Sequence, residues 1–148
     1  MTDKQTEILE RARTLLAEMN VGHQVPTMRI NTQFAKYKTL PVTASKIGGV
    51  PYLPAGAQSP TDESGKPLGM IAQINCAELP DNPIYPPTGM VQFWVSTNSG
   101  WGIDKEEDHR VIYYPQLGEA NPDAVATCED RERDFWWPIK HECALEFT

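Results

Sequence analysis

Residues 45–54, SKIGGVPYLP, form the stretch around which the chain is organised. Two adjacent glycines, Gly48 and Gly49, allow a positive φ or a close approach of the backbone to a neighbouring segment. Prolines at positions 51 and 54 fix φ, and each disfavours helix in the residue before it. We therefore predict a rigid, extended, turning segment, with a helix before it and β-sheet after it.

Residues 3–20 have the spacing of an amphipathic helix. Apolar residues recur on one helical face, and Gly22 is placed to end the helix. We expect this helix to dock on its own sheet, and an interface with another molecule is the alternative. The residues of this face are Ile8, Leu9, Ala12, Leu15, Leu16 and Met19.

Short alternating segments after the helix predict strands. Thirteen prolines in 148 residues require many turns and argue against a helical bundle. The predicted fold is therefore a single mainly β domain over residues 1–148, a β roll or α+β arrangement with an antiparallel sheet and one N-terminal amphipathic helix. Residues 55–67 form a polar loop in which we expect Asp62, Glu63 and Lys66 to be solvated. The strands are expected at 25–32, 40–43, 70–75, 90–96, 110–114 and 143–147.

The charge balance limits the partners. A net charge of −7 disfavours nucleic acid and anionic membrane surfaces, and leaves a basic protein as a possible partner. No apolar run approaches 18 residues, and the N-terminus lacks the apolar core of a signal peptide. The three cysteines are then expected to be reduced thiols in a cytoplasmic protein.

Four blocks in a fixed order resemble the YwqG-like family, a bacterial group of unknown function. The blocks are SKIGGVPYLP, GKPLGMIAQINCAELP, GMVQFWVS and HRVIYYP, over about residues 45–115. The resemblance implies a mainly β roll with a flanking helix, and it implies no activity. The chain is shorter than typical members, so it is either a short member or the front part of a longer one. In the second case the last strand, ALEFT, lies at an open sheet edge, and we expect self-association through it.

Chemistry-bearing residues give little support for catalysis. Cys128, His141 and Cys143 are the only local group of soft ligands, but their spacing does not match a structural zinc site. None of the cysteines sits in a recognisable nucleophile setting; Cys76 is most simply a small buried apolar residue. No phosphate loop or dinucleotide motif is present. The sequence therefore predicts no catalytic, cofactor-binding or metal-binding residue.

Two candidate sites remain. Tryptophans near acidic blocks form a possible partner-binding surface, and this favours a non-catalytic module that binds a protein, in one version an immunity-like protein that neutralises a basic partner. The alternative is a small-molecule binder or enzyme whose pocket joins Gly48, Gly49, Gln73, Gln92 and the 55–67 loop. A third hypothesis is that the chain is half of a larger protein whose site lies elsewhere. The residues of the first surface are Trp101, Asp104, Glu106, Glu107, Asp108, Trp136 and Trp137.

Overall fold

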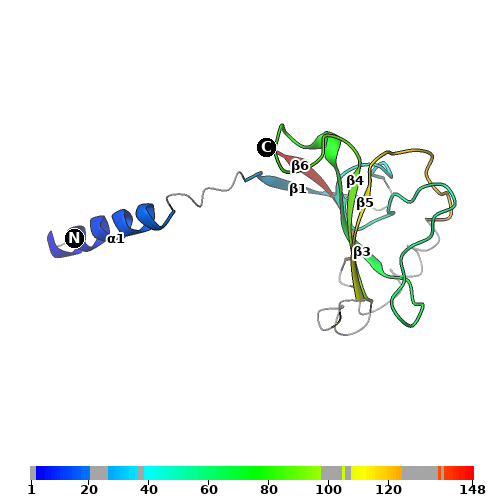
Figure 1. Ribbon diagram of the computed structural model, residues 1–148, viewed down its shortest axis with the longest axis horizontal. Helices are drawn as coiled ribbons and strands as arrows, with labels where there is room; N and C mark the ends of the chain where they lie inside the picture. The colour runs from blue at the N-terminus through cyan, green and yellow to red at the C-terminus, as the bar shows by residue number, and fades with distance from the viewer. Residues whose placement is uncertain are drawn as a thin grey trace.

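Six strands form one antiparallel sheet in the computed structural model, which describes residues 3–20, 27–36, 39–97, 105, 108–124, 137 and 139–148. The strand order is β1-β6-β2-β3-β4-β5 (Figure 1). The mainly β fold with one N-terminal helix is therefore confirmed. The elements are α1 (Asp3–Asn20), β1 (Ile30–Ala35), β2 (Lys46–Ile47), β3 (Gly69–Asn75), the 3-10 helix η1 (Cys76–Glu78), β4 (Met90–Val95), β5 (His109–Tyr114) and β6 (Glu142–Phe147).

The last strand does not lie at the edge of the sheet. β6 pairs along its whole length with β1, where Ile30 is opposite Phe147, and on its other side it pairs with β2. The prediction of an open edge at β6 was therefore wrong, and the edge strands are β1 and β5. The sequence missed this because β1 carries only one weak alternation and begins later than the predicted strand at 25–32. Residues 40–43 form a turn instead of a strand.

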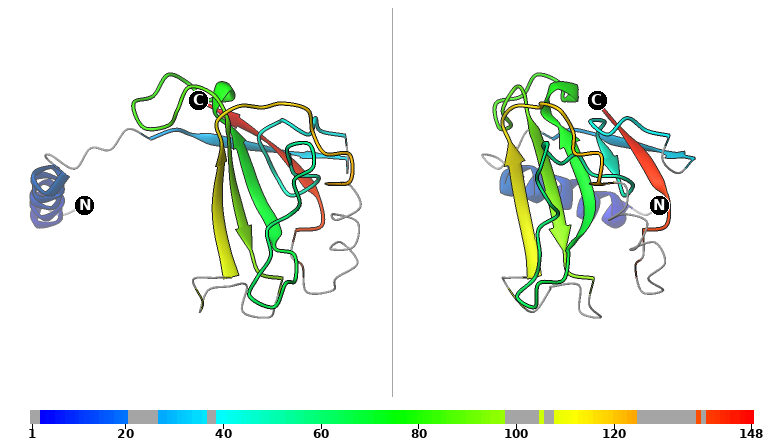
Figure 2. Two further views of the ribbon diagram at one scale, coloured as in Figure 1. Left: turned by 45° about the vertical axis from the view of Figure 1, so that its right-hand side comes forward. Right: turned by 90° about the vertical axis from the view of Figure 1, so that its right-hand side faces the viewer.

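The core lies on one side of this sheet. Figure 2 shows the segments around residues 50–68 and 115–124 on that side, with α1 on the other. Residues of the 45–54 stretch, of β3 and β4 and of the following loops pack together there, because the two prolines hold the chain extended across the sheet. The core cluster consists of Val50, Leu53, Leu68, Met70, Trp94 and Ala124.

The helix does not pack on its own sheet. Its large apolar side chains are between 47% and 73% exposed, from Leu9 to Met19. The helix projects away from the sheet in Figure 1. The expectation that α1 docks on its own sheet was therefore wrong, although the helix itself was predicted correctly. Helical periodicity identifies the apolar stripe of α1, but it does not indicate which surface covers that stripe.

The two central glycines have the architectural role that their positions predict. Gly48 and Gly49 both have a φ of 70°. A Cβ at Gly49 would overlap the Glu142 side chain, and one at Gly48 would lie 2.8 Å from the carbonyl oxygen of His141. The chain therefore needs glycine at these positions for two reasons, the backbone conformation and the close approach to the end of β6.

Replacing Gly49 by valine is expected to lower the free energy of unfolding by about 3 kcal/mol or more, because left-handed strain and a steric overlap add. Gly56→Val is the matched control, since Gly56 has a φ of 76° and open space around it. The control should lose only the strain, about 1–2 kcal/mol. Urea denaturation followed by tryptophan fluorescence measures both; equal losses in the two variants would show that the overlap contributes nothing.

Candidate functional site

The two glutamines of the predicted pocket lie in the protein interior. Gln73 and Gln92 are 0% exposed. The Gln73 Oε1 accepts hydrogen bonds from the Tyr52 backbone N–H at 2.9 Å and from Gln92 Nε2 at 3.2 Å. Gln92 Nε2 also donates to the Tyr52 carbonyl oxygen at 2.6 Å, and Gln92 Oε1 accepts from Trp94 Nε1 at 3.1 Å. Both side chains are thus bonded to other parts of the protein.

These hydrogen bonds explain why polar residues occupy the buried face. The extended segment at Tyr52 crosses the sheet instead of joining its edge, so its buried backbone groups cannot pair with a strand. Gln73 and Gln92 supply an acceptor and a donor to that backbone in place of a strand. The expectation that they face a ligand pocket is therefore not met.

A buried ion pair lies beside the glutamines. Lys46 of β2 is opposite Gln73 in the sheet, and its Nζ is 3.7 Å from Glu142 Oε1 with both side chains 0% exposed. Lys46 Nζ also donates to the Pro41 carbonyl oxygen at 3.0 Å, and Glu142 Oε2 accepts from the backbone N–H groups of Thr39 and Leu40. The pair ties the 39–41 turn to β2 and β6, and its burial gives it a role in the fold.

The predicted acidic and aromatic surface falls largely outside the described residues. Trp101, Asp104, Glu106, Glu107 and Trp136 are all in that group. Asp108 is half-buried, and its carbonyl oxygen accepts from the Ser96 N–H at 2.7 Å. Trp137 is only 7% exposed, and its ring occupies the space that a side chain at Gly69 would need. Trp137 is therefore a packing residue and not part of an exposed surface.

The cysteine and acidic residues that are described have structural settings. Cys76 is buried as predicted, and burial raises the pKa of its thiol, which keeps it protonated and unreactive. Asp62, expected to be solvated, is buried in a tight turn. Its Oδ1 accepts from the hydroxyl and N–H of Ser64 and from the N–H of Lys66, and the Ser64 hydroxyl contributes most to lowering its pKa. The turn gives order to the 55–67 loop.

Among the described residues, no group of three or more His, Cys, Asp or Glu side chains is placed to hold a metal ion. Cys128 of the candidate ligand group lies outside them. The described part of the chain also contains no helix long and apolar enough to cross a membrane.

The feature that stands out is an apolar row on the side of the sheet away from the core. Residues directly opposite in an antiparallel pair have their side chains on the same face. Following the pairing from strand to strand therefore gives one row that crosses all six strands. The row consists of Phe34, Cys143, Ile47, Ala72, Phe93 and Val111, and none of these side chains is buried.

A second, shorter row continues this surface. Ile74, Val91 and Tyr113 are paired across β3, β4 and β5, and all three are half-buried or exposed. We call these nine residues the apolar face. At its two ends Phe34 is 85% exposed and Val111 is 66% exposed.

A bulge at Ile71 sets this arrangement in β3. The register shifts between Met70 and Ala72, so Met70 and Gln73 both face the core and Ala72 faces away. A strict alternation from Met70 would have placed Met70 and Ala72 on the same face. The alternation in the sequence of β4 separates two faces of the strand, but it does not indicate which face the rest of the chain covers.

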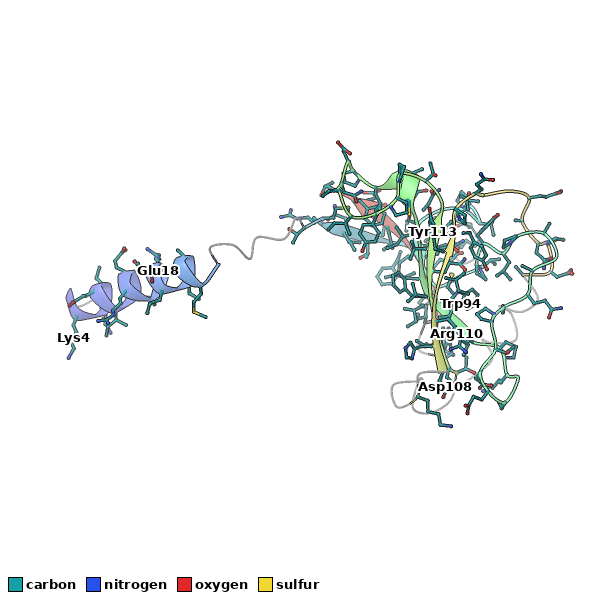
Figure 3. The ribbon with its side chains drawn as sticks, viewed as in Figure 1. Lys4, Glu18, Trp94, Asp108, Arg110 and Tyr113 are labelled. Carbon is teal, nitrogen blue, oxygen red and sulfur yellow. The ribbon has the colours of Figure 1, made fainter. Side chains whose placement is uncertain are left out.

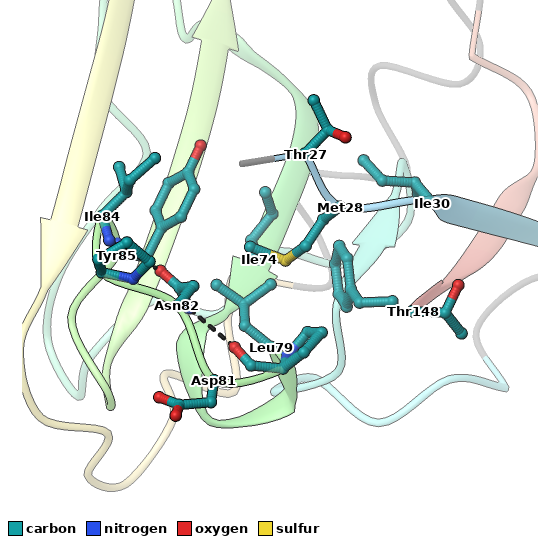
Figure 4. A pocket seen from close by; sticks show the side chains of 13 residues that line it. Thr27, Met28, Ile30, Ile74, Leu79, Asp81, Asn82, Ile84, Tyr85 and Thr148 are labelled. Atoms are coloured by element: carbon teal, nitrogen blue, oxygen red, sulfur yellow. Dashed lines mark hydrogen bonds between the residues drawn. The ribbon is translucent and has the colours of Figure 1, made fainter. Parts of the chain in front are cut away.

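An apolar groove adjoins the apolar face at one end. It has a volume of about 380 Å³ and lies between the 79–85 connector and the start of β1. Figure 4 shows Ile84 and Tyr85 on one side, Thr27, Met28 and Ile30 on the other, and Ile74 between them. Because Ile74 belongs to both, the groove and the apolar face form one continuous surface.

A family model described as a domain of unknown function matches residues 45–148. The chain belongs to this DUF1963 family. No curated protein matches the chain significantly. The DUF1963 match begins at the SKIGGVPYLP stretch and includes β2 to β6, whereas α1 and β1 precede it. The apolar face is thus built mainly from the DUF1963 domain, and β1 adds Phe34 to its edge.

Proposed function

We propose that this protein is a non-catalytic interaction module that binds a protein partner on its apolar face. The observation that carries the proposal is the apolar row from Phe34 to Val111, whose two ends are exposed and whose other four residues are half-buried. Exposed apolar surface costs free energy in water, and contiguous exposed patches of this kind mark interaction sites. A row of one chemical character across six strands is such a patch.

The groove and the net charge suggest two properties of the partner, an apolar anchor side chain and positive charge. A groove of about 380 Å³ next to the apolar face has room for an apolar anchor side chain of the partner. The net charge of −7 would speed the approach of a cationic partner through long-range attraction. An immunity-like protein that neutralises a basic partner is one version of this function. The order of the sequence blocks supports placement in the YwqG-like group, and the unpaired Cys76 and Cys143 support a cytoplasmic location.

Selection of a displayed random peptide library on the full chain tests the proposed function. We expect the wild-type chain to enrich peptides with apolar anchors, and Phe34→Asp and Val111→Asp to reduce binding of these peptides at least about tenfold, because a charge on the face must be desolvated. Asn31→Asp is the matched control: it adds the same charge on β1, but at an exposed position that points to the opposite side from Phe34.

The outcomes separate clearly. Peptides that lose binding to both face variants and keep it to the control support the proposal. Failure to enrich any peptide, or enriched peptides that bind the face variants as well as the wild type, would overturn it. Both face positions are well exposed, so each variant should still fold, which a cooperative thermal unfolding transition checks.

A further inference from the structure

The N-terminal helix is a second uncovered apolar surface on the same chain. Figure 3 shows its side chains projecting around the helix without meeting any other element. Ile8, Leu15, Leu16 and Met19 lie on one stripe, and each is at least half exposed. An isolated helix of 18 residues is marginally stable in water and gains most of its stability by packing its apolar stripe. Packing of this stripe against another surface would therefore stabilise the helix.

The dimensions of the helix and the apolar face agree. Eighteen residues at about 1.5 Å each give a helix about 27 Å long. Six strands at about 4.8 Å spacing make the row from Phe34 to Val111 about 24 Å long, measured along the sheet. The stripe is also wider than a coiled-coil seam, because Leu9 and Leu16 flank the positions that would form it, and a broad stripe suits a sheet better than a second helix.

The position of the helix argues for a second molecule as the source of the surface. α1 stands off its own sheet, on the side of the apolar face (Figure 2). The start of β1 is fixed, because Arg29 and Thr148 exchange two backbone hydrogen bonds of 2.8 and 3.0 Å. Residues 21–28 remain as a tether, and eight residues span at most about 29 Å, enough to reach a neighbouring copy.

We propose that two copies of this chain form a symmetric dimer in which α1 of each copy covers the apolar face of the other. The inference rests on the proposed function, because it names the occupant of the same face: a second copy of this chain, in place of the basic partner. Each copy carries both halves of the contact, so a two-fold axis satisfies both at once and closes the assembly. The exchange buries both helix stripes and both apolar faces. A pair in which only one helix docked on the other copy would leave one stripe and one face exposed.

Sedimentation of the full chain over a range of concentrations tests the dimer. We expect the wild type to reach twice the chain mass, and Leu16→Glu on the stripe to raise the dimer dissociation constant at least tenfold. Ala17→Glu is the matched control, because it adds the same charge one residue away, about 100° around the helix and off the apolar stripe. Val111→Asp on the apolar face should weaken the dimer as Leu16→Glu does.

Mixing the two defective variants identifies the exchanged contact. A Leu16→Glu copy keeps an intact apolar face, and a Val111→Asp copy keeps an intact helix, so one of the two contacts can form in a mixed pair. We therefore expect the mixture to associate more strongly than either variant alone. A dimer that Val111→Asp leaves unchanged would indicate pairing between helices and would overturn the exchange.

Hydrogen exchange distinguishes the remaining outcomes. A wild-type monomer with protected α1 amides would place the helix on its own sheet and overturn the dimer. A monomer with unprotected α1 amides overturns it too; if the peptide selection then succeeds, the interaction function stands and only the identity of the partner is wrong. If the selection also fails, both proposals fall.

Discussion

Replacing Glu142 by glutamine is expected to lower the free energy of unfolding by about 3–5 kcal/mol, because it removes the buried carboxylate that faces the buried Lys46 ammonium. The side chains of both residues are 0% exposed, and their charged atoms are 3.7 Å apart. Glutamine keeps the shape and an oxygen that can still accept from the Thr39 and Leu40 N–H groups. The loss would therefore report the charge and not the packing. Urea denaturation at fixed pH measures it.

A double variant and an exposed pair make this test decisive. Lys46→Met together with Glu142→Gln removes both charges. The free energy of unfolding that this double variant loses should therefore be several kcal/mol smaller than the sum of the losses of the two single variants. Glu63→Gln is the control in an exposed pair, where Glu63 Oε2 lies 3.8 Å from Lys105 Nζ, and it should change stability by less than about 1 kcal/mol. Additive losses at Lys46 and Glu142 would show that the pair is not coupled.

Most elements of this fold could be predicted because their signals are local. β4 alternates over six residues after Gly89, and β5 is rich in β-branched and aromatic residues and ends before Pro115, so β4 was predicted to within one residue at its end. The glycines at 48 and 49 were assigned a scaffold role from their type and spacing, and their φ values and contacts agree. Such features depend on a few neighbouring residues and not on the rest of the chain.

The apolar face could not be predicted because it depends on pairing between distant strands. Phe34 and Val111 belong to one row only because β6 inserts between β1 and β2, an order that no sequence period indicates. Alternation in β4 separates Phe93 from Gln92, and hydrophobicity alone would bury Phe93. The opposite holds because the 45–54 stretch crosses the other face and its backbone needs the glutamine amides.

The burial of the two glutamines on the core face leads to the second large prediction, the effect of replacing Gln73 by leucine. The substitution removes the acceptor of the Tyr52 N–H and the donor that binds the carbonyl oxygens of Val42 and Ala44 at 2.7 and 2.8 Å. Each buried backbone group left without a partner costs about 1–3 kcal/mol. We expect a total loss of about 3–6 kcal/mol, a large share of the 5–15 kcal/mol that stabilises a typical domain.

Three further measurements assign this loss to the crossing segment. Gln58→Leu, at an exposed position in the 55–67 loop, should change stability by less than about 0.5 kcal/mol. Gln92→Leu should also destabilise, and the double variant should lose less than the sum, because the two amides share a hydrogen bond of 3.2 Å. Amide exchange at Tyr52 should accelerate in Gln73→Leu. If Tyr52 stayed as protected as in the wild type, its N–H would have another partner, and the glutamines would be polar residues that the fold tolerates and not ones that it requires.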